Sequence, residues 1–134
     1  MIQKLIKTDE EWGKILNHQQ FLILREKGTE EAFSGSLLNN KEKGIYHCIA
    51  CNNPLFSSES KFDSGTGWPS FSEPITKEAI IVQPYKGEGL SGAEVLCSKC
   101  EGHLGHVFED GPLPTKLRFC MNSAVLTFKK TQSK

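Results

Sequence analysis

The stretch Cys97-Ser98-Lys99-Cys100-Glu101-Gly102-His103-Leu104-Gly105-His106-Val107-Phe108 joins a Cys-x-x-Cys unit directly to two histidines. A second unit, Cys48-Ile49-Ala50-Cys51, precedes it, and 45 residues separate the two units. Each unit brings two sulfurs close together, and Asn52 or Gly102 follows with the freedom that the left-handed turn of a metal knuckle requires. We therefore expect Cys48, Cys51, Cys97 and Cys100 to bind one structural Zn²⁺, with iron as the softer alternative.

The four cysteines could instead be buried free thiols or form a thioredoxin-like redox pair. Two matched units disfavour both, and a redox pair belongs at a strand-to-helix turn in a βαβ unit, which these glycine-rich surroundings do not offer. The spacing between the units also exceeds that of a simple zinc ribbon. The metal is therefore expected to tie together the two ends of an inserted β segment, and to contribute on the order of 10 kcal/mol or more to folding.

The rest of the chain predicts one domain over residues 1–134, with a helical part at about 8–28 and a β-rich core at about 34–128. Thr8 and Glu11 form a capping-box pattern that predicts a short helix from Thr8 to about Leu16. A second helix is predicted from Gln19 to Lys27, with Gly28 as its terminator.

After residue 33 short apolar runs alternate with Gly, Pro, Asn and Ser, which is typical of a β-rich domain with many turns. The fold class is therefore mainly β. A hairpin loop is expected at 87–92 and a solvated polar tail at 129–134. The predicted strands cover residues 44–48, 68–71, 79–84, 93–96, 107–108 and 117–128.

The charge balance excludes a strong electrostatic attraction to polyanions, because the 16 Lys and Arg residues equal the 16 Asp and Glu residues in number and the formal net charge is zero. No apolar run approaches the roughly 20 residues that cross a bilayer, and the first residues turn polar too early for a signal peptide. We expect a cytoplasmic monomer, since thiolate ligands suit a reducing compartment and the sequence predicts no exposed apolar helix face for an interface.

The fifth cysteine, Cys120, lies in a segment that alternates like a strand. A period of two places Arg118, Cys120 and Asn122 on one face, and Phe119 and Met121 toward the core. A free cysteine is usually a small buried hydrophobe. With a cation and an amide donor on its own face, however, the Cys120 thiolate could be stabilised, and the thiolate is the form that attacks.

His103 and His106 follow the second knuckle, so the metal would anchor the segment that carries them. Four thiolates already satisfy a zinc ion, which leaves both imidazoles available as acids or hydrogen-bond donors. Trp68 lies between glycines and a proline, and composition leaves it equally consistent with a core residue or a pocket wall.

Four segments carry these residues in order: LREKGTE at 24–30, KFDSGTGWPSF at 61–71, GHLGHVFEDGP at 102–112 and RFCMNSA at 118–124. Together they resemble the methionine sulfoxide reductase B family, whose members reduce the R epimer of methionine sulfoxide. The resemblance implies a tent-like fold of two antiparallel sheets, zinc on the four knuckle cysteines and a nucleophile at Cys120.

The resemblance also implies roles for the other candidate residues. His103 and His106 supply or relay the proton that the departing sulfoxide oxygen needs, and Asn122 holds the substrate or the nucleophile. Trp68 receives the substrate's S-methyl group, and Arg118 and Phe119 are taken as further substrate-binding residues. Cys120 ends the reaction as a sulfenic acid that must be reduced before another cycle.

One departure from the family concerns that recycling step. Many members carry a resolving cysteine in the segment where this chain has Thr66. We therefore expect an external thiol to reduce the sulfenic acid, most simply thioredoxin, with glutathione or glutaredoxin as alternatives. A lesser alternative is that a knuckle cysteine resolves it at the expense of the metal.

Two other classes of protein compete with this interpretation. A zinc-ribbon binding module for protein or nucleic acid would show a basic face with interleaved aromatics, which the balanced charge disfavours. It would also leave Cys120, His103 and His106 unexplained. A thiol-based peroxide sensor needs a reactive cysteine too, and the relative rates with peroxide and with a methionine sulfoxide peptide separate it from a reductase.

Overall fold

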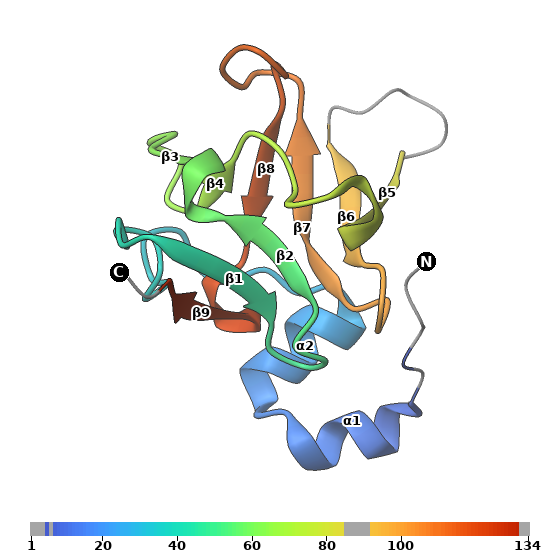
Figure 1. The fold of residues 1–134 in the computed structure, drawn as a ribbon. Coiled ribbons are helices and arrows are strands. Elements are labelled where there is room, and N and C mark those ends of the chain that lie inside the picture. Colours follow the sequence, from blue (N-terminus) through green and yellow to red (C-terminus); the bar gives the residue numbers. More distant parts are fainter. Residues whose placement is uncertain (1–4, 6, 85–91, 132–134) are drawn as a thin grey trace.

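Two antiparallel sheets dominate the structure, a computed structural model that describes residue 5, residues 7–84 and residues 92–131. Two helices lie at one end of the sheets, near the loops that carry the Cys-x-x-Cys units (Figure 1). The prediction of a mainly β fold with two antiparallel sheets is confirmed.

The smaller sheet has the strand order β2-β1-β9, and the larger sheet has the order β3-β4-β8-β7-β6-β5. The strands of the smaller sheet are β1 Gly44–Cys48, β2 Pro54–Ser57 and β9 Leu126–Lys130. Those of the larger sheet are β3 Lys61–Phe62, β4 Ser70–Phe71, β5 Ile80–Gln83, β6 Ala93–Cys97, β7 His103–Phe108 and β8 Arg118–Met121. Three short 3₁₀ turns are η1 Ser58–Ser60, η2 Lys77–Ala79 and η3 Ser123–Val125.

The two helices are α1 Asp9–Ile15 and α2 His18–Glu26. The capping box of α1 is present: the Glu11 amide donates to Thr8 Oγ1 at 3.2 Å, and the Thr8 amide donates to Glu11 Oε1 at 2.8 Å. At the end of α2 the left-handed residue is Lys27 (φ 60°) and not the predicted Gly28. Neither helix has the length and apolar character to cross a membrane, in the part of the chain that the structure describes.

The segment predicted as one strand at 117–128 is two strands. β8 belongs to the larger sheet, η3 follows it, and β9 then pairs with β1 in the smaller sheet. Apolar alternation continues through both strands, so no local pattern marks the change of sheets at Asn122. Lys129 and Lys130, predicted to lie in a solvated tail, belong to β9.

Three other strand predictions differ from the structure. The sequence patterns predict neither β2 nor β3, and β7 begins at His103 and not at residue 107. β7 is a central strand paired on both sides, by β6 and β8. The predicted hairpin loop at 87–92 lies outside the described residues, except for Gly92 (φ 84°).

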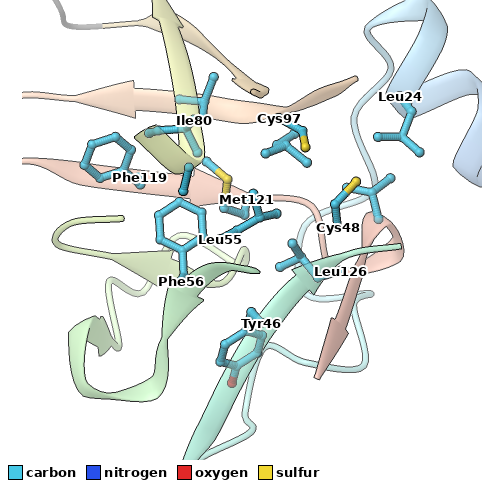
Figure 2. Close-up of a cluster of buried hydrophobic side chains, with 14 of the residues drawn as sticks. Leu24, Tyr46, Cys48, Leu55, Phe56, Ile80, Cys97, Phe119, Met121 and Leu126 are labelled. Carbon is cyan, nitrogen blue, oxygen red and sulfur yellow. The ribbon is translucent and has the colours of Figure 1, made fainter. Parts of the chain in front are cut away.

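The core fills the space between the two sheets (Figure 2). Phe56 of β2 stacks on Phe71 of β4 with ring centroids 4.5 Å apart, and Tyr46 of β1 meets the same ring edge-on at 5.1 Å. Phe119 and Met121 of β8 are buried, as the alternation predicts. Aromatic side chains from both sheets therefore hold β4 and β8 in place, and β8 carries Cys120 into the candidate site.

Candidate active site

A cavity of about 210 Å³ opens on the larger sheet, and Cys120 is among the residues that line it. It is small beside the pockets that hold drug-sized ligands, and suits the end of one side chain. Its lining residues are Thr29, Thr66, Trp68, Gly105, His106, Phe108, Arg118, Cys120 and Asn122.

Strand pairing builds one wall of this cavity. Cys120 on β8 lies opposite Ser70 on β4 and opposite His106 on β7, and His106 lies opposite Glu94 on β6. Residues directly opposite in antiparallel strands project on the same face of the sheet. The strand register therefore places the Cys120 thiol, the His106 imidazole and the Glu94 carboxylate in one row across the sheet, in that order.

The environment of Cys120 differs from the one expected. Burial is the strongest influence and raises the pKa of the thiol, while the charge of Arg118 and a hydrogen bond with Thr66 lower it less. The balance leaves the Cys120 pKa above its ordinary value, so the expectation of a stabilised thiolate is wrong for the protein without substrate. Burial also lowers the pKa of His106, and the charge of His103 adds to this effect.

Arg118 is less available to the thiol than the sequence suggested. Its Nε donates to Asp110 Oδ1 at 2.9 Å and its Nη2 to Asp110 Oδ2 at 3.3 Å. The guanidinium also lies 4.5 Å from the centre of the Phe108 ring. Arg118 thus forms a fixed edge of the cavity, with part of its charge engaged by a carboxylate.

The structure separates the two histidines that the sequence treated alike. His106 is half-buried and lines the cavity, whereas His103 is 2% exposed and does not line it. His103 Nδ1 lies 2.8 Å from Glu94 Oε2, and its ring contacts the His106 ring edge-on with centroids 5.1 Å apart. Only His106 is therefore placed to touch a molecule bound beside Cys120.

Asn122 and Trp68 both form hydrogen bonds with the backbone of Glu30. The amide of Glu30 donates to Asn122 Oδ1 at 2.9 Å, and Trp68 Nε1 donates to the Glu30 carbonyl at 3.0 Å. Asn122 Nδ2 also donates to the Leu104 carbonyl at 2.9 Å. Both side chains line the cavity in orientations that backbone groups determine.

Phe119 does not join the other candidates. Its side chain is 4% exposed and lies on the opposite face of β8 from Cys120, with its ring 5.9 Å from that of Phe56. Phe119 is a core residue, so its expected role as a substrate contact is wrong. The period-two alternation already indicated this, since it assigns Phe119 and Cys120 to opposite faces.

The four remaining cysteines form a second, separate cluster. Their sulfurs all lie within 4.8 Å of one another, with Cys48 Sγ 3.7 Å from Cys100 Sγ and Cys51 Sγ 3.4 Å from Cys97 Sγ. Metal–sulfur bonds of about 2.3 Å in a tetrahedron require sulfurs about 3.8 Å apart, so the arrangement fits one metal ion. The left-handed residues after the units are Asn52 (φ 65°), as expected, and Glu101 (φ 62°) in place of Gly102.

Burial and crowding make it costly for these thiols to ionise together. The pKa of Cys97 is lowered by hydrogen bonds from the other three thiols, while those same contacts and burial raise the pKa of Cys48. Several thiolates at this separation require a cation among them. The chemistry of the donor set therefore agrees with the predicted metal site.

Sequence reasoning missed four residues of the site. Thr29, Gly105 and Phe108 line the cavity, and Glu94 holds His103. Extending the period of two from His106 would have found Phe108. No comparable signal marks Thr29, which follows the end of α2, or Glu94, which reaches the site only because β6 pairs with β7.

Comparisons with known proteins identify the family of the chain. A family model described as the SelR domain matches residues 16–130. The chain is 54% identical over 124 residues to "Peptide methionine sulfoxide reductase MsrB" of Leptospira interrogans, covering 92% of this chain and 95% of the relative. It is 52% identical over 130 residues to the protein of that name from Methanosarcina barkeri, covering 96% and 92%. With a domain match over most of its length and relatives that align nearly end to end, the chain belongs to the MsrB family of peptide methionine sulfoxide reductases.

Proposed function

We propose that this protein reduces the R epimer of methionine sulfoxide in proteins to methionine, with Cys120 as nucleophile. The observation that carries the proposal is the pairing of Cys120 with His106 inside a cavity walled by Trp68. A nucleophile and an acid on opposite strands of one sheet face the same small volume. That is the arrangement that breaking a sulfur–oxygen bond requires.

The reduction step balances with one proton. The Cys120 thiolate and a proton convert the sulfoxide to the thioether, and the oxygen ends on Cys120 as a sulfenic acid. Two electrons pass from the cysteine sulfur to the sulfoxide sulfur. Since the thiol form is favoured in the free protein, the proton that Cys120 loses on activation can pass to His106 and from there to the leaving oxygen.

The other cavity residues orient the substrate. The Trp68 ring forms an apolar wall for the S-methyl group, which lets the site distinguish a pyramidal sulfur from its mirror image. Asn122 acts as a positioning residue, because its amide is bound to the backbone of Leu104 and Glu30. The cavity is small, so we infer that it takes only the oxidised side chain and leaves the rest of a peptide outside.

Recycling falls to an external thiol. Thr66, where many relatives carry a second cysteine, lines the cavity and forms a hydrogen bond with Cys120. The other four cysteines of the chain belong to the metal cluster. One external thiol attacks the sulfenic acid, which releases water and leaves a mixed disulfide with Cys120. A second thiol attacks that disulfide and releases the Cys120 thiol, so the two external thiols together supply the two electrons and end as a disulfide. Thioredoxin is the proposed donor, with glutathione or glutaredoxin as alternatives.

The cluster of Cys48, Cys51, Cys97 and Cys100 is proposed to hold Zn²⁺. Four thiolates in a closed shell suit zinc, and iron is the alternative. Such an ion supplies folding free energy. We place the protein in a reducing compartment such as the cytoplasm, where these thiols stay unoxidised.

The test of the proposal is a reductase assay on separated R and S epimers of a methionine sulfoxide peptide, with dithiothreitol and with thioredoxin as reductants. We expect turnover of the R epimer alone, and loss of at least about a thousandfold in C120S because serine is a far weaker nucleophile. The same enzyme with hydrogen peroxide is the control. Faster oxidation by peroxide than by the peptide would favour the thiol sensor, and activity retained in C120S would refute the proposal.

Recycling has its own prediction. After a single turnover without reductant, intact-mass spectrometry should find Cys120 as a sulfenic acid, trapped by dimedone, with no disulfide inside the chain. T66C is the matched variant, because it restores a thiol beside Cys120 and should convert the product to an intramolecular disulfide. A disulfide between Cys120 and a cluster cysteine in the unmodified protein would contradict the external-thiol route.

A further inference from the structure

Glu94 shares the strand register of the cavity without lining it. It lies opposite His106, which in turn lies opposite Cys120, so the three side chains occupy one face of β6, β7 and β8. Directly opposed Cβ atoms in antiparallel strands are about 4.5–5.5 Å apart. Glu94 therefore stands immediately behind the imidazole that faces the nucleophile.

An irregularity in β7 brings His103 to the same face. Val95 pairs with Gly105, but the next residue of β6, Leu96, pairs with His103, so Leu104 is an extra residue. Such a bulge changes the face on which the residue next to it, here His103, projects its side chain. His103 and His106 would lie on opposite faces of a regular strand, and here their rings contact edge-on at 5.1 Å.

Glu94 fixes the buried imidazole of His103 through a short contact. Its Oε2 lies 2.8 Å from His103 Nδ1, and its Oε1 lies 3.3 Å from Lys27 Nζ at the end of α2. Burial works to raise the Glu94 pKa, but the contacts with His103 and Lys27 outweigh it and lower the pKa, which keeps the side chain ionised. A carboxylate only accepts hydrogen bonds, so His103 carries its proton on Nδ1.

The other ring nitrogen of His103 has no such partner. His103 Nε2 is buried, and no atom of the described chain forms a hydrogen bond with it. A buried polar nitrogen left in this state is costly, and in a catalytic neighbourhood it points to a role in proton exchange or ring placement. The Glu94 contact fixes a proton on Nδ1, the other nitrogen of the ring.

We propose that Glu94 is a positioning residue for the reduction, holding His103 with a proton on Nδ1 against the back of His106 so that His106 faces the sulfoxide oxygen as the acid. The inference rests on the proposed function, in which His106 protonates that oxygen. Glu94 acts on the reaction only through the two imidazoles. Its negative charge also offsets the charge of His103, which otherwise disfavours protonation of His106.

The charge effect has a definite sign. Among the described residues, the titratable or charged groups around His106 are Glu94 on β6, His103 on β7, and Cys120 and Arg118 on β8, with Lys27 at the end of α2 behind Glu94. Removal of the Glu94 charge takes away a negative charge that raises the His106 pKa, so that pKa falls further. His106 donates the proton that it takes from Cys120, and without the Glu94 charge this pair loses its proton at lower pH. The alkaline limb of the kcat profile therefore moves to lower pH.

The experiment compares E94Q and E94A with E42Q in the full-length, metal-loaded protein. Glu42 forms an exposed ion pair with Lys130 (3.1 Å) on the other sheet, so E42Q controls for the loss of one carboxylate. We expect E94A to lower kcat by about ten- to a hundredfold with KM within about twofold. E94Q should lose less, because its amide oxygen still accepts from Nδ1–H, yet show the same displacement of the pH profile. E42Q should match the unmodified protein.

Long-range ¹⁵N–¹H spectra of the histidines give a readout that does not depend on turnover. His103 should carry its proton on Nδ1 in the unmodified protein and lose that preference in E94A. Both Glu94 variants keeping kcat within twofold with an unshifted profile would overturn the proposal, and so would a loss of kcat that only tracks the fraction of folded protein. Failure of the proposed function is distinguishable, since the unmodified enzyme would then reduce neither epimer.

Discussion

At the level of single residues, Cys120 and His106 form a pair whose pKa values are moved in opposite directions by the same cause. Burial raises the pKa of the thiol and lowers the pKa of the imidazole. The neutral pair is therefore favoured near neutral pH, and the thiolate forms only when a proton moves within the cavity. A nucleophile that rests as a thiol is less exposed to oxidation between turnovers.

This arrangement predicts slow alkylation of Cys120 by iodoacetamide in the free protein at pH 7. The rate should rise with pH and reach half of its plateau above the ordinary thiol pKa of about 8.5, because a raised pKa leaves less thiolate at any given pH. R118Q should move this midpoint higher still, since Arg118 is the cation that lowers the Cys120 pKa. The modified peptide is quantified by mass spectrometry, and a midpoint below that of a free thiol would contradict the structure.

At the level of elements, the site depends on how closely β7 and β8 approach. A Cβ atom at Gly105 would lie 2.0 Å from the Cys120 carbonyl oxygen, far inside any allowed contact. Gly105 therefore permits the pairing that sets His106 opposite Cys120. The glycine is needed because there is no space for a side chain at this position.

We expect G105A to destabilise the protein by about 3 kcal/mol in urea unfolding, because backbone atoms cannot move aside as a flexible side chain can. G13A is the matched control. Gly13 lies inside α1 with nothing within 4 Å of its Cβ position, so alanine there should stabilise the protein by roughly 0.5–1 kcal/mol. Equal effects of the two substitutions would show that the β7–β8 approach is less tight than described.

At the level of the whole molecule, the cysteine cluster joins the two sheets. Cys48 ends β1 of the smaller sheet and Cys97 ends β6 of the larger sheet, and both side chains are buried. Figure 2 shows these two sulfurs at the same end of the core, next to Leu24 of α2. The cluster also lies at the start of β7, since Cys100 is only three residues before His103.

Removal of the metal should therefore unfold the protein. We expect chelation at neutral pH to abolish the cooperative thermal transition followed by circular dichroism, since binding of a structural ion contributes on the order of 10 kcal/mol. C97S should lose the ion as well, whereas C120S should retain one metal per chain and its stability, because Cys120 is outside the cluster. Elemental analysis separates zinc from iron, and a full metal equivalent in C97S would contradict the four-cysteine site.

Local patterns in the sequence predicted several features of the fold and of the candidate site. Two Cys-x-x-Cys units predicted the four-cysteine cluster, and the Thr8–Glu11 capping box predicted the start of α1. The period-two alternation predicted that Cys120 and Phe119 lie on opposite faces of their strand. These features depend on neighbours in the chain. The geometry of a strand or a helix turn fixes how residues two or three positions apart are placed relative to each other. Such features can therefore be predicted from the sequence without knowing the fold.

Only the tertiary structure decided the features that depend on distant segments. The bulge at Leu104, the row from Glu94 to Cys120 and the change of sheets at Asn122 all come from pairing with strands elsewhere in the chain. The raised pKa of Cys120 has the same origin, because burial is a property of what packs around a residue and not of its sequence neighbours. Sequence thus determined which groups are present and their local faces, and packing decided which of them meet and in what protonation state.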